Sequence, residues 1–156
     1  MSTSSFPTGP AARQPWYERT KWILLGGGVA VLLLVWMFGR SAFASYRLAS
    51  AAVERFHAQL NRNDYETIYA DAAAEFRSAG SRADGIKFFE TLHGRLGDVR
   101  KSHIAGFHVY ASTNKGTFVD VVYETEFSQG TAQESFIWRV RDGKTFLYRY
   151  HYNPTH

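Results

Sequence analysis

The pattern of hydrophobic and polar positions is most distinctive near the start of the chain, where a long run carries no charge. Eighteen consecutive residues, from Trp22 to Gly39, have uncharged side chains, and Lys21 and Arg40 bound the run. A helix of that length rises about 27 Å, close to the thickness of the hydrocarbon core of a bilayer. A lone segment in hydrocarbon has to pair its own backbone groups, which only a helix achieves. The pattern therefore predicts a transmembrane helix over residues 21–40, with residues 22–39 in contact with lipid.

The residues on either side of this run indicate its orientation and leave one alternative open. Three basic residues lie upstream, and Arg40 and Arg47 lie downstream. Because the cytoplasmic flank of a span carries the excess of Lys and Arg, we expect the C-terminal part to be exported. The alternative is a cleaved signal peptide, since Ala42-Phe43-Ala44 fits the small-x-small cleavage pattern. The uncharged run is longer than the usual apolar region of a signal peptide, about 7–15 residues, which favours an anchor.

The segment before the uncharged run has little to bury. The first fifteen residues are rich in Ser, Thr, Pro and Gly, a composition typical of a disordered tail. The expected organisation is a disordered tail over residues 1–20, a transmembrane helix over 21–40 and one folded domain over 41–156.

After the run, the spacing of apolar residues becomes helical. One stripe recurs at steps of three and four and consists of Tyr46, Ala49, Val53, Phe56 and Leu60. Asp64 is placed to cap a second helix, and Asp84 to cap a third helix that ends at Gly97. These stripes predict three helices whose apolar faces share one core.

Beyond Gly97 the period changes from 3.6 to 2, which is typical of strands with one buried face. Asp142-Gly143 is a strong signal for a two-residue hairpin, and Gln129-Gly130 and Ser112–Gly116 are placed as the other two turns. Four strands are expected, over roughly residues 99–111, 117–127, 131–141 and 144–152. The predicted fold class is α+β, with three helices packed on a four-stranded antiparallel sheet.

Counting outward from these turns gives a register in which one face of the sheet changes from apolar to polar along its length. Thr125 is placed opposite Glu134, and Phe136 opposite Arg149, with His151 in the last polar row. In one interpretation the polar end extends past the helices into water. In the other it is the mouth of a cavity between sheet and helices, where Glu134, Arg149 and His151 converge as ligand-binding groups.

The opposite face of the sheet combines polar side chains with large apolar ones. Asp120 is placed across from Arg139, as an ion pair worth less than about 1 kcal/mol. The apolar side chains expected on this face are Phe118, Val122, Ile137, Phe146, Tyr148 and Tyr150. Such a patch exceeds the few hundred Å², roughly, that a monomer usually exposes. We expect a second copy of the chain or a protein partner to cover it, unless its tyrosines simply tolerate solvent.

Composition and charge exclude several classes of function. With 0 Cys, the chain has no disulfide, no cysteine zinc site and no thiol nucleophile. The net charge of +4 is spread along the chain, whereas nucleic-acid binding concentrates basic residues, so no nucleic-acid partner is expected. The 6 His lack the paired spacing of metal sites, and no phosphate-binding glycine loop, dinucleotide fingerprint or nucleophile elbow occurs. We therefore assign no metal, no cofactor and no catalytic residue.

Several short motifs follow one another along the folded part of the chain. They are DYETIY at 64–69, EFR at 75–77, LG at 96–97, YETEF at 123–127, G-x-AQE-x-F at 130–136 and DG at 142–143. Through them, residues 50–152 resemble bacterial small-domain families of unknown function in the nuclear-transport-factor-two-like superfamily. The resemblance implies a curved sheet wrapped around helices as a cystatin-like cone, often dimeric and often with a pocket. Some members of that superfamily are isomerases or dehydratases with an Asp or His base and Tyr donors, but no such motif matches here.

Two hypotheses of function follow. The first is a single-pass, membrane-anchored domain of a bacterial inner (plasma) membrane, exposed on the extracytoplasmic side, which binds or interacts without catalysis. The second is a small-ligand binder, or an isomerase- or hydratase-like enzyme, that uses the cone cavity around Glu134, Arg149 and His151.

Overall fold

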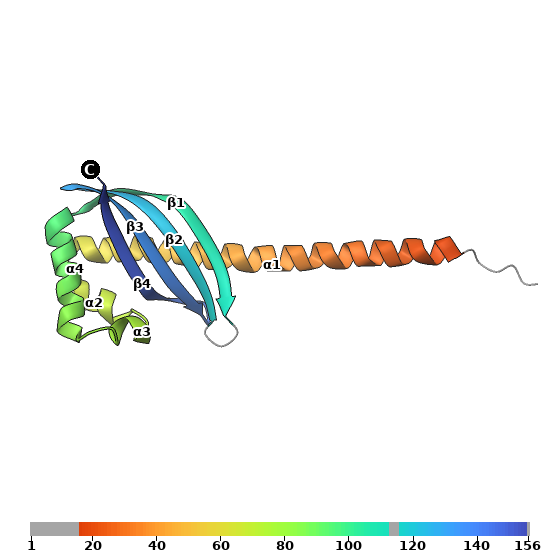
Figure 1. Cartoon of the computed structure of the whole chain (residues 1–156), viewed down its shortest axis with the longest axis horizontal. Helices are drawn as coiled ribbons and strands as arrows, with labels where there is room; N and C mark the ends of the chain where they lie inside the picture. The colour runs from red at the N-terminus through yellow and green to blue at the C-terminus, as the bar shows by residue number, and fades with distance from the viewer. Residues whose placement is uncertain (1–15, 113–115, 156) are drawn as a thin grey trace, which may run out of the picture. The chain divides into compact units, whose positions relative to one another are not determined.

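The computed structural model describes residues 16–112 and 116–155 (Figure 1). For residues 16–32, 34, 37–39, 41, 42 and 112 it describes the backbone alone. The elements are α1 (Trp16–Asn61), α2 (Tyr65–Ala70), α3 (Ala74–Arg77), α4 (Arg82–Leu96), β1 (Val99–Ser112), β2 (Gly116–Phe127), β3 (Gly130–Arg141) and β4 (Lys144–Thr155). The chain divides into two compact units, Met1–Gly39 and Arg40–His156, and each is described by itself.

The first unit contains the N-terminal part of α1. The backbone of the predicted span over residues 21–40 is helical, but most of its side chains lie outside those described. Within the part of the chain that the structure describes, no helix combines the length and the apolar character that crossing a membrane requires. The transmembrane helix therefore stays a prediction from the sequence. Most of the expected tail over residues 1–20 lies outside the described residues.

The second unit confirms the α+β class and the four-stranded antiparallel sheet. The strands pair in the order β1-β2-β3-β4, as a meander. The sheet curves over the C-terminal part of α1, while α2, α3 and α4 lie together at one side (Figure 1). Three register shifts, two in the edge strand β1 and one in the edge strand β4, interrupt the pairing and help to bend the sheet.

The ends of the helices follow from local chemistry, with one correction. Asp64 caps α2 as expected, and its side chain accepts a hydrogen bond from the backbone N–H of Thr67. The N-cap of α4 is Ser81 and not Asp84, because the Ser81 hydroxyl accepts from the Asp84 N–H at 3.1 Å. Gly97 ends α4 with a φ of 78°, a conformation that glycine adopts without strain. The short helix α3 was missing from the sequence prediction.

The core lies between the inner face of the sheet and the helices. Its members are mostly aromatic and branched aliphatic, and the largest fully buried ones include Phe56, Phe89, Phe136, Leu60, Leu92 and Leu147. The Phe56 ring, on α1, packs edge-on against Phe89 of α4 and Phe136 of β3. The predicted helical stripe is thus confirmed as the face of α1 that meets the sheet.

The register between β2 and β3 differs from the prediction by two residues. The turn is Ser128-Gln129, so Phe127 pairs with Gly130 and Thr125 pairs with Ala132. A shift of two leaves every side chain on its expected face, because side chains alternate with a period of two. It nevertheless breaks the predicted pairing of Asp120 with Arg139. Arg139 instead forms an ion pair with Glu75 of α3 at 2.7 Å.

Candidate functional site

The three predicted ligand-binding residues do not converge on one cavity. Glu134 lies on the inner face of β3 and is 0% exposed. Arg149 pairs with Ile137 and His151 pairs with Ser135, so both side chains belong to the outer face of the sheet, where they are exposed. The structure therefore separates Glu134 from the other two predicted residues.

A β-bulge at Tyr148 causes this separation. Next to the Asp142-Gly143 hairpin the predicted register is confirmed, as far as the pairing of Trp138 with Leu147. The next pair is Ile137 with Arg149, so one extra residue is inserted in β4. The insertion reverses the faces beyond this point. Tyr150, expected on the outer face, consequently points into the core and is 8% exposed.

Glu134 is the centre of a buried hydrogen-bond network that joins three strands to α1. Its Oε2 accepts from the Thr125 hydroxyl at 2.5 Å and lies 2.8 Å from Nε2 of His57. Its Oε1 accepts from the Tyr150 hydroxyl at 2.6 Å. These contacts satisfy a carboxyl group whose burial would otherwise be costly. We call Glu134, His57, Thr125 and Tyr150 the inner network.

The electrostatics of the inner network are most visible at Tyr150. Burial of its phenol raises its pKa well above the ordinary tyrosine value, and the nearby negative charge of Glu134 and the hydrogen bond to it act in the same direction. The phenol therefore stays protonated as a donor to Glu134 in neutral solution. Burial also raises the pKa of Tyr123, whose ring lies edge-on to His57.

The inner network cannot act on a substrate as it stands. A general base has to lie within hydrogen-bond reach of the proton that it removes. Glu134 has no exposed surface, and in the surrounding core the ring of Phe136 stacks on that of Trp138 and packs at a tilt against that of Tyr150. The hydrogen bonds to its carboxyl group come from the protein itself. The arrangement is that of a satisfied structural group in the core.

Sequence reasoning identified Glu134 but missed His57 and Tyr150. His57 lies four residues after Val53 and three before Leu60, so its helical position marks it as flanking the apolar stripe. That signal would have placed an imidazole near the sheet. No comparable signal exists for Tyr150, because its inward direction depends on the bulge at Tyr148.

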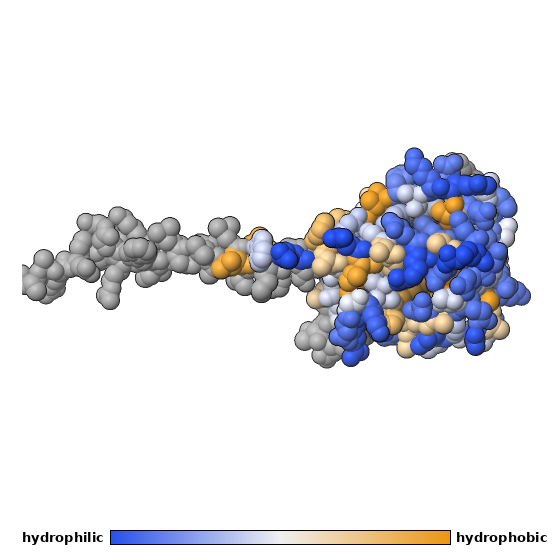
Figure 2. All heavy atoms as spheres, turned by 180° about the vertical axis from the view of Figure 1, so that it is seen from behind, coloured by the Kyte–Doolittle hydropathy of each residue, from blue (hydrophilic) through white to orange (hydrophobic). Residues whose placement is uncertain are grey.

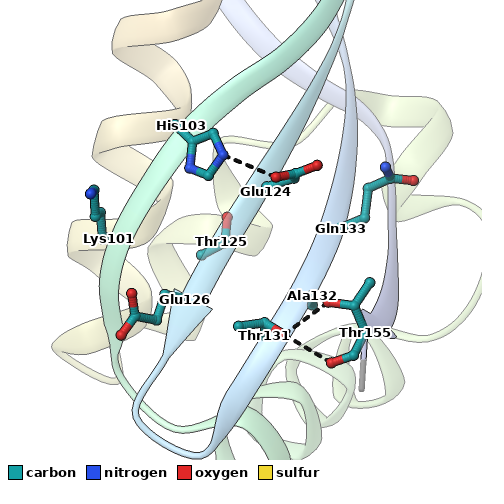
Figure 3. A pocket seen from close by; sticks show the side chains of 9 residues that line it. All are labelled: Lys101, His103, Glu124, Thr125, Glu126, Thr131, Ala132, Gln133 and Thr155. Atoms are coloured by element: carbon teal, nitrogen blue, oxygen red, sulfur yellow. Dashed lines mark hydrogen bonds and ion pairs between the residues drawn. The ribbon is translucent and has the colours of Figure 1, made fainter.

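An open hollow of about 400 Å³ lies on the outer face of the sheet (Figure 3). Its lining comes from all four strands, and eight of its nine residues have polar side chains: Lys101, His103, Glu124, Thr125, Glu126, Thr131, Ala132, Gln133 and Thr155. His103 and Glu124 point toward one another, with Nε2 and Oε2 3.0 Å apart. The Thr131 hydroxyl donates to the backbone carbonyl of Thr155 at 2.8 Å. We call this feature the outer hollow.

A second bulge places His103 in the outer hollow. Phe107 pairs with Val121 as predicted, but the extra residue Ala105 shifts the register, so that His103 pairs with Glu124 and not with Thr125. The outer hollow thus contains a histidine and two carboxylates. Among the described residues, however, no three side chains of metal-binding type are grouped as a metal ion would require.

Arg149 lines a different hollow, of about 300 Å³, between α3 and β4. Phe76, Ala79 and Tyr150 line both this hollow and a neighbouring one of about 320 Å³ against α4. Within the described ranges, the side chain of Arg149 makes no ion pair or hydrogen bond. This groove, formed by the hollow that Arg149 lines, therefore combines aromatic side chains with a guanidinium group that has no partner among the described residues.

The outer apolar patch expected from the sequence is largely covered by the chain itself. Phe118 is 4% exposed, with Tyr110 stacked on its ring and Tyr148 edge-on to it. Tyr150 does not belong to this face, because the bulge at Tyr148 turns it into the core, as described above. The remaining side chains of the set are half-buried. The expected partner on this face stays a prediction.

No model of a known protein family matches the chain, and no curated protein matches it.

Proposed function

We propose that the chain is a single-pass membrane-anchored domain that binds or interacts without catalysis, with its folded unit on the extracytoplasmic side of a bacterial inner (plasma) membrane. The observation that supports the absence of catalysis in this proposal is the burial and hydrogen bonding of Glu134. This carboxyl group, the best candidate base inside the fold, has no exposed surface and is held by Thr125, Tyr150 and His57. An isomerase- or hydratase-like reaction needs an accessible base.

The membrane anchor is supported by the sequence. Residues 22–39 carry no charge, and basic residues bound them at both ends. Three basic residues upstream against two downstream favour a cytoplasmic N-terminus. The resemblance to the nuclear-transport-factor-two-like superfamily, and the cystatin-like cone that it implies, are part of the same proposal, supported by a bent sheet around α1.

Protease treatment of cells that express the full-length chain tests the anchor and its orientation. We expect an added protease to degrade the folded unit in intact spheroplasts, and the unit to sediment with membranes after lysis. Protection in spheroplasts, with degradation only after permeabilisation, would reverse the orientation. A mature protein that begins at Ser45 would establish cleavage, and an uncut chain in the aqueous fraction would remove the anchor.

Binding of a small polar ligand is a second candidate function, and the outer hollow is the observation that favours it. Its volume of about 400 Å³ falls within the usual range of ligand sites, and its side chains offer both donors and acceptors. Pockets for drug-like molecules are mainly apolar, so this lining suits a hydrophilic ligand such as a sugar or an amino acid.

Ligand-detected NMR with panels of monosaccharides and amino acids tests this candidate on the full-length chain in detergent. For a compound that binds, we expect the transfer of magnetisation from protein to ligand to disappear in Glu124→Ala and Gln133→Ala, because these changes remove side chains that line the hollow. The matched control is Arg149→Ala, in the separate groove beside α3, which should retain binding. No transfer from either panel, or equal transfer to all three variants, would reject the outer hollow as the site.

A further inference from the structure

Three aromatic side chains at the start of the second unit form an exposed cluster. Phe43 and Tyr46 lie on α1, and Phe107 lies on the edge strand β1. The ring centroids of Tyr46 and Phe107 are 4.8 Å apart, and those of Phe43 and Tyr46 are 6.4 Å apart. Phe43 is 62% exposed and Phe107 is 60% exposed. We call these three residues the aromatic cluster.

The exposure of the aromatic cluster is unusual for this fold. Phe107 pairs with Val121 and so belongs to the inner face of the sheet, where most of the large side chains of β2 and β3 are buried. Ile104, also on the inner face of β1, is 36% exposed. On the face of the folded unit that Figure 2 shows, hydrophilic side chains predominate, and hydrophobic areas lie among them at several places. Grouped exposed apolar side chains mark interaction surfaces, whereas single ones do not.

The position of Phe43 in the chain restricts where the cluster can be. Phe43 follows Gly39, the last residue of the uncharged run, by four residues. Four residues span at most about 14 Å in any conformation. The headgroup layer on each side of a bilayer is roughly 5–8 Å thick. If residues 22–39 span a membrane, the cluster is therefore tethered within reach of the headgroups.

The charges around the aromatic cluster match a lipid surface. Residues 40–53 contain Arg40 and Arg47 and no acidic residue. The two basic residues of β1, Arg100 and Lys101, lie at its other end, where Val99 bonds to Asn61 of α1, so they do not belong to this surface. Basic residues near a membrane are attracted to anionic headgroups, and aromatic rings favour the boundary between headgroups and hydrocarbon.

We propose that the aromatic cluster seats the folded unit on an anionic lipid surface, with Phe43, Tyr46 and Phe107 in the headgroup layer. We call this contact between the aromatic cluster and the lipid the seat. It rests on the proposed membrane anchor, and it adds a second contact with the same membrane. A single membrane helix would leave the folded unit free to rotate relative to the membrane surface. The seat holds β1 against the lipid, and this orients the unit on the membrane.

The absence of cysteine in the sequence allows a direct test with single spin labels. The full-length chain is reconstituted in vesicles of phosphatidylcholine and phosphatidylglycerol in equal parts. A nitroxide is attached at Ala105→Cys, an exposed position of β1, or at the control Glu90→Cys, an exposed position of α4. We expect the label at 105 to collide several-fold more with lipid-soluble oxygen, relative to a water-soluble nickel chelate, than the label at 90.

Substitutions in the cluster separate the seat from the anchor. Phe43→Ser with Phe107→Ser, in the Ala105→Cys background, should lower the collision ratio to that of the control position. Phe88→Ser, which changes an exposed Phe of α4, should leave the ratio unchanged. Thermal melting by circular dichroism checks that these variants remain folded.

Three results would overturn the seat. Equal ratios at positions 105 and 90, in chains that float with the vesicles, would remove the seat and leave the anchor. Spin–spin broadening at position 105 that survives dilution with lipid would assign the cluster to a second copy of the chain. Failure of the full-length chain to float with vesicles would remove the anchor and the seat together.

Discussion

Two His–Glu pairs in the described part of the chain have nearly the same geometry in opposite environments. His57 and Glu134 are 2.8 Å apart, and their side chains are 7% and 0% exposed. His103 and Glu124 are 3.0 Å apart, and theirs are 62% and 59% exposed. The first pair belongs to the inner network, and the second belongs to the outer hollow.

This difference in burial decides what each pair can do. A buried polar group costs free energy unless every partner is in place, so the inner pair contributes to a unique core. An exposed pair competes with water and salt, so it contributes little to stability and is free to exchange its partner for a ligand. The same two residue types thus serve structure on one face and are available for binding on the other.

The largest expected effect comes from removing the carboxyl group of the inner pair. Glu134→Ala leaves Thr125, Tyr150 and His57 buried without their acceptor, so we expect the free energy of unfolding to fall by about 3–5 kcal/mol. Glu124→Ala, the matched change on the outer face, should cost less than about 0.5 kcal/mol. Denaturant unfolding monitored by circular dichroism measures both.

The comparison between the two pairs can still be made if Glu134→Ala fails to fold. If Glu134→Ala does not fold, Glu134→Gln keeps an acceptor oxygen and should unfold with an intermediate loss of about 1–3 kcal/mol. Equal stability of the Glu134 and Glu124 variants would contradict the assignment of the inner network.

The next effect isolates one hydrogen bond of the inner network. Tyr150→Phe keeps the ring in the core but leaves Oε1 of Glu134 without its donor, at an expected cost of about 1–3 kcal/mol. The control is Tyr148→Phe, on the neighbouring bulged residue, whose hydroxyl has no hydrogen bond within the described part of the chain. Thermal melting should separate the two variants, and a matching decrease for Tyr148→Phe would reject the interpretation.

Alkaline solution should weaken the inner network without affecting the exposed pair. The pKa of Tyr150 is raised in the folded state, chiefly by burial. Its contribution is therefore complete below the unfolded tyrosine pKa of about 10 and is lost as the pH rises from there toward the folded value. Stability measured between neutral and strongly alkaline pH should fall less in Tyr150→Phe than in the natural chain. Parallel curves would show that Tyr150 does not contribute.

The smallest effect concerns the outer pair. A double-mutant cycle of His103→Ala and Glu124→Ala should give a coupling of less than about 1 kcal/mol in mildly acidic buffer, and the coupling should shrink as salt is added. The same cycle on His57 and Glu134 should give a larger coupling that salt hardly changes. Similar values for the two pairs would abolish the distinction between the two faces.

Much of the fold could be predicted because it depends on local signals. Asp142-Gly143 specifies its hairpin, Gly97 ends α4, and alternation marks the strands. The candidate site was only partly predictable, since Glu134 was found but its partners His57 and Tyr150 were not. The predicted association of Glu134 with Arg149 and His151 was wrong in its geometry, because it assumed an uninterrupted register.

Register depends on packing over long distances in the chain. In β4, Leu147 and Tyr150 are three residues apart and both face the core. A regular strand would turn one of them outward, so the extra residue Tyr148 is the condition for burying both. In β1, Ile104 and Phe107 show the same spacing around Ala105.

The sequence alone determined the order of the strands and of every helix except α3, the hairpin at Asp142 and the uncharged run that predicts an anchor. These features depend on the periodicity of neighbouring residues and on turn chemistry. Only the tertiary structure decided which face the side chains of β1 and β4 occupy beyond the bulges at Ala105 and Tyr148. A bulge moves every later side chain to the other face, and its position depends on which rings fit against α1, a condition that no local pattern contains.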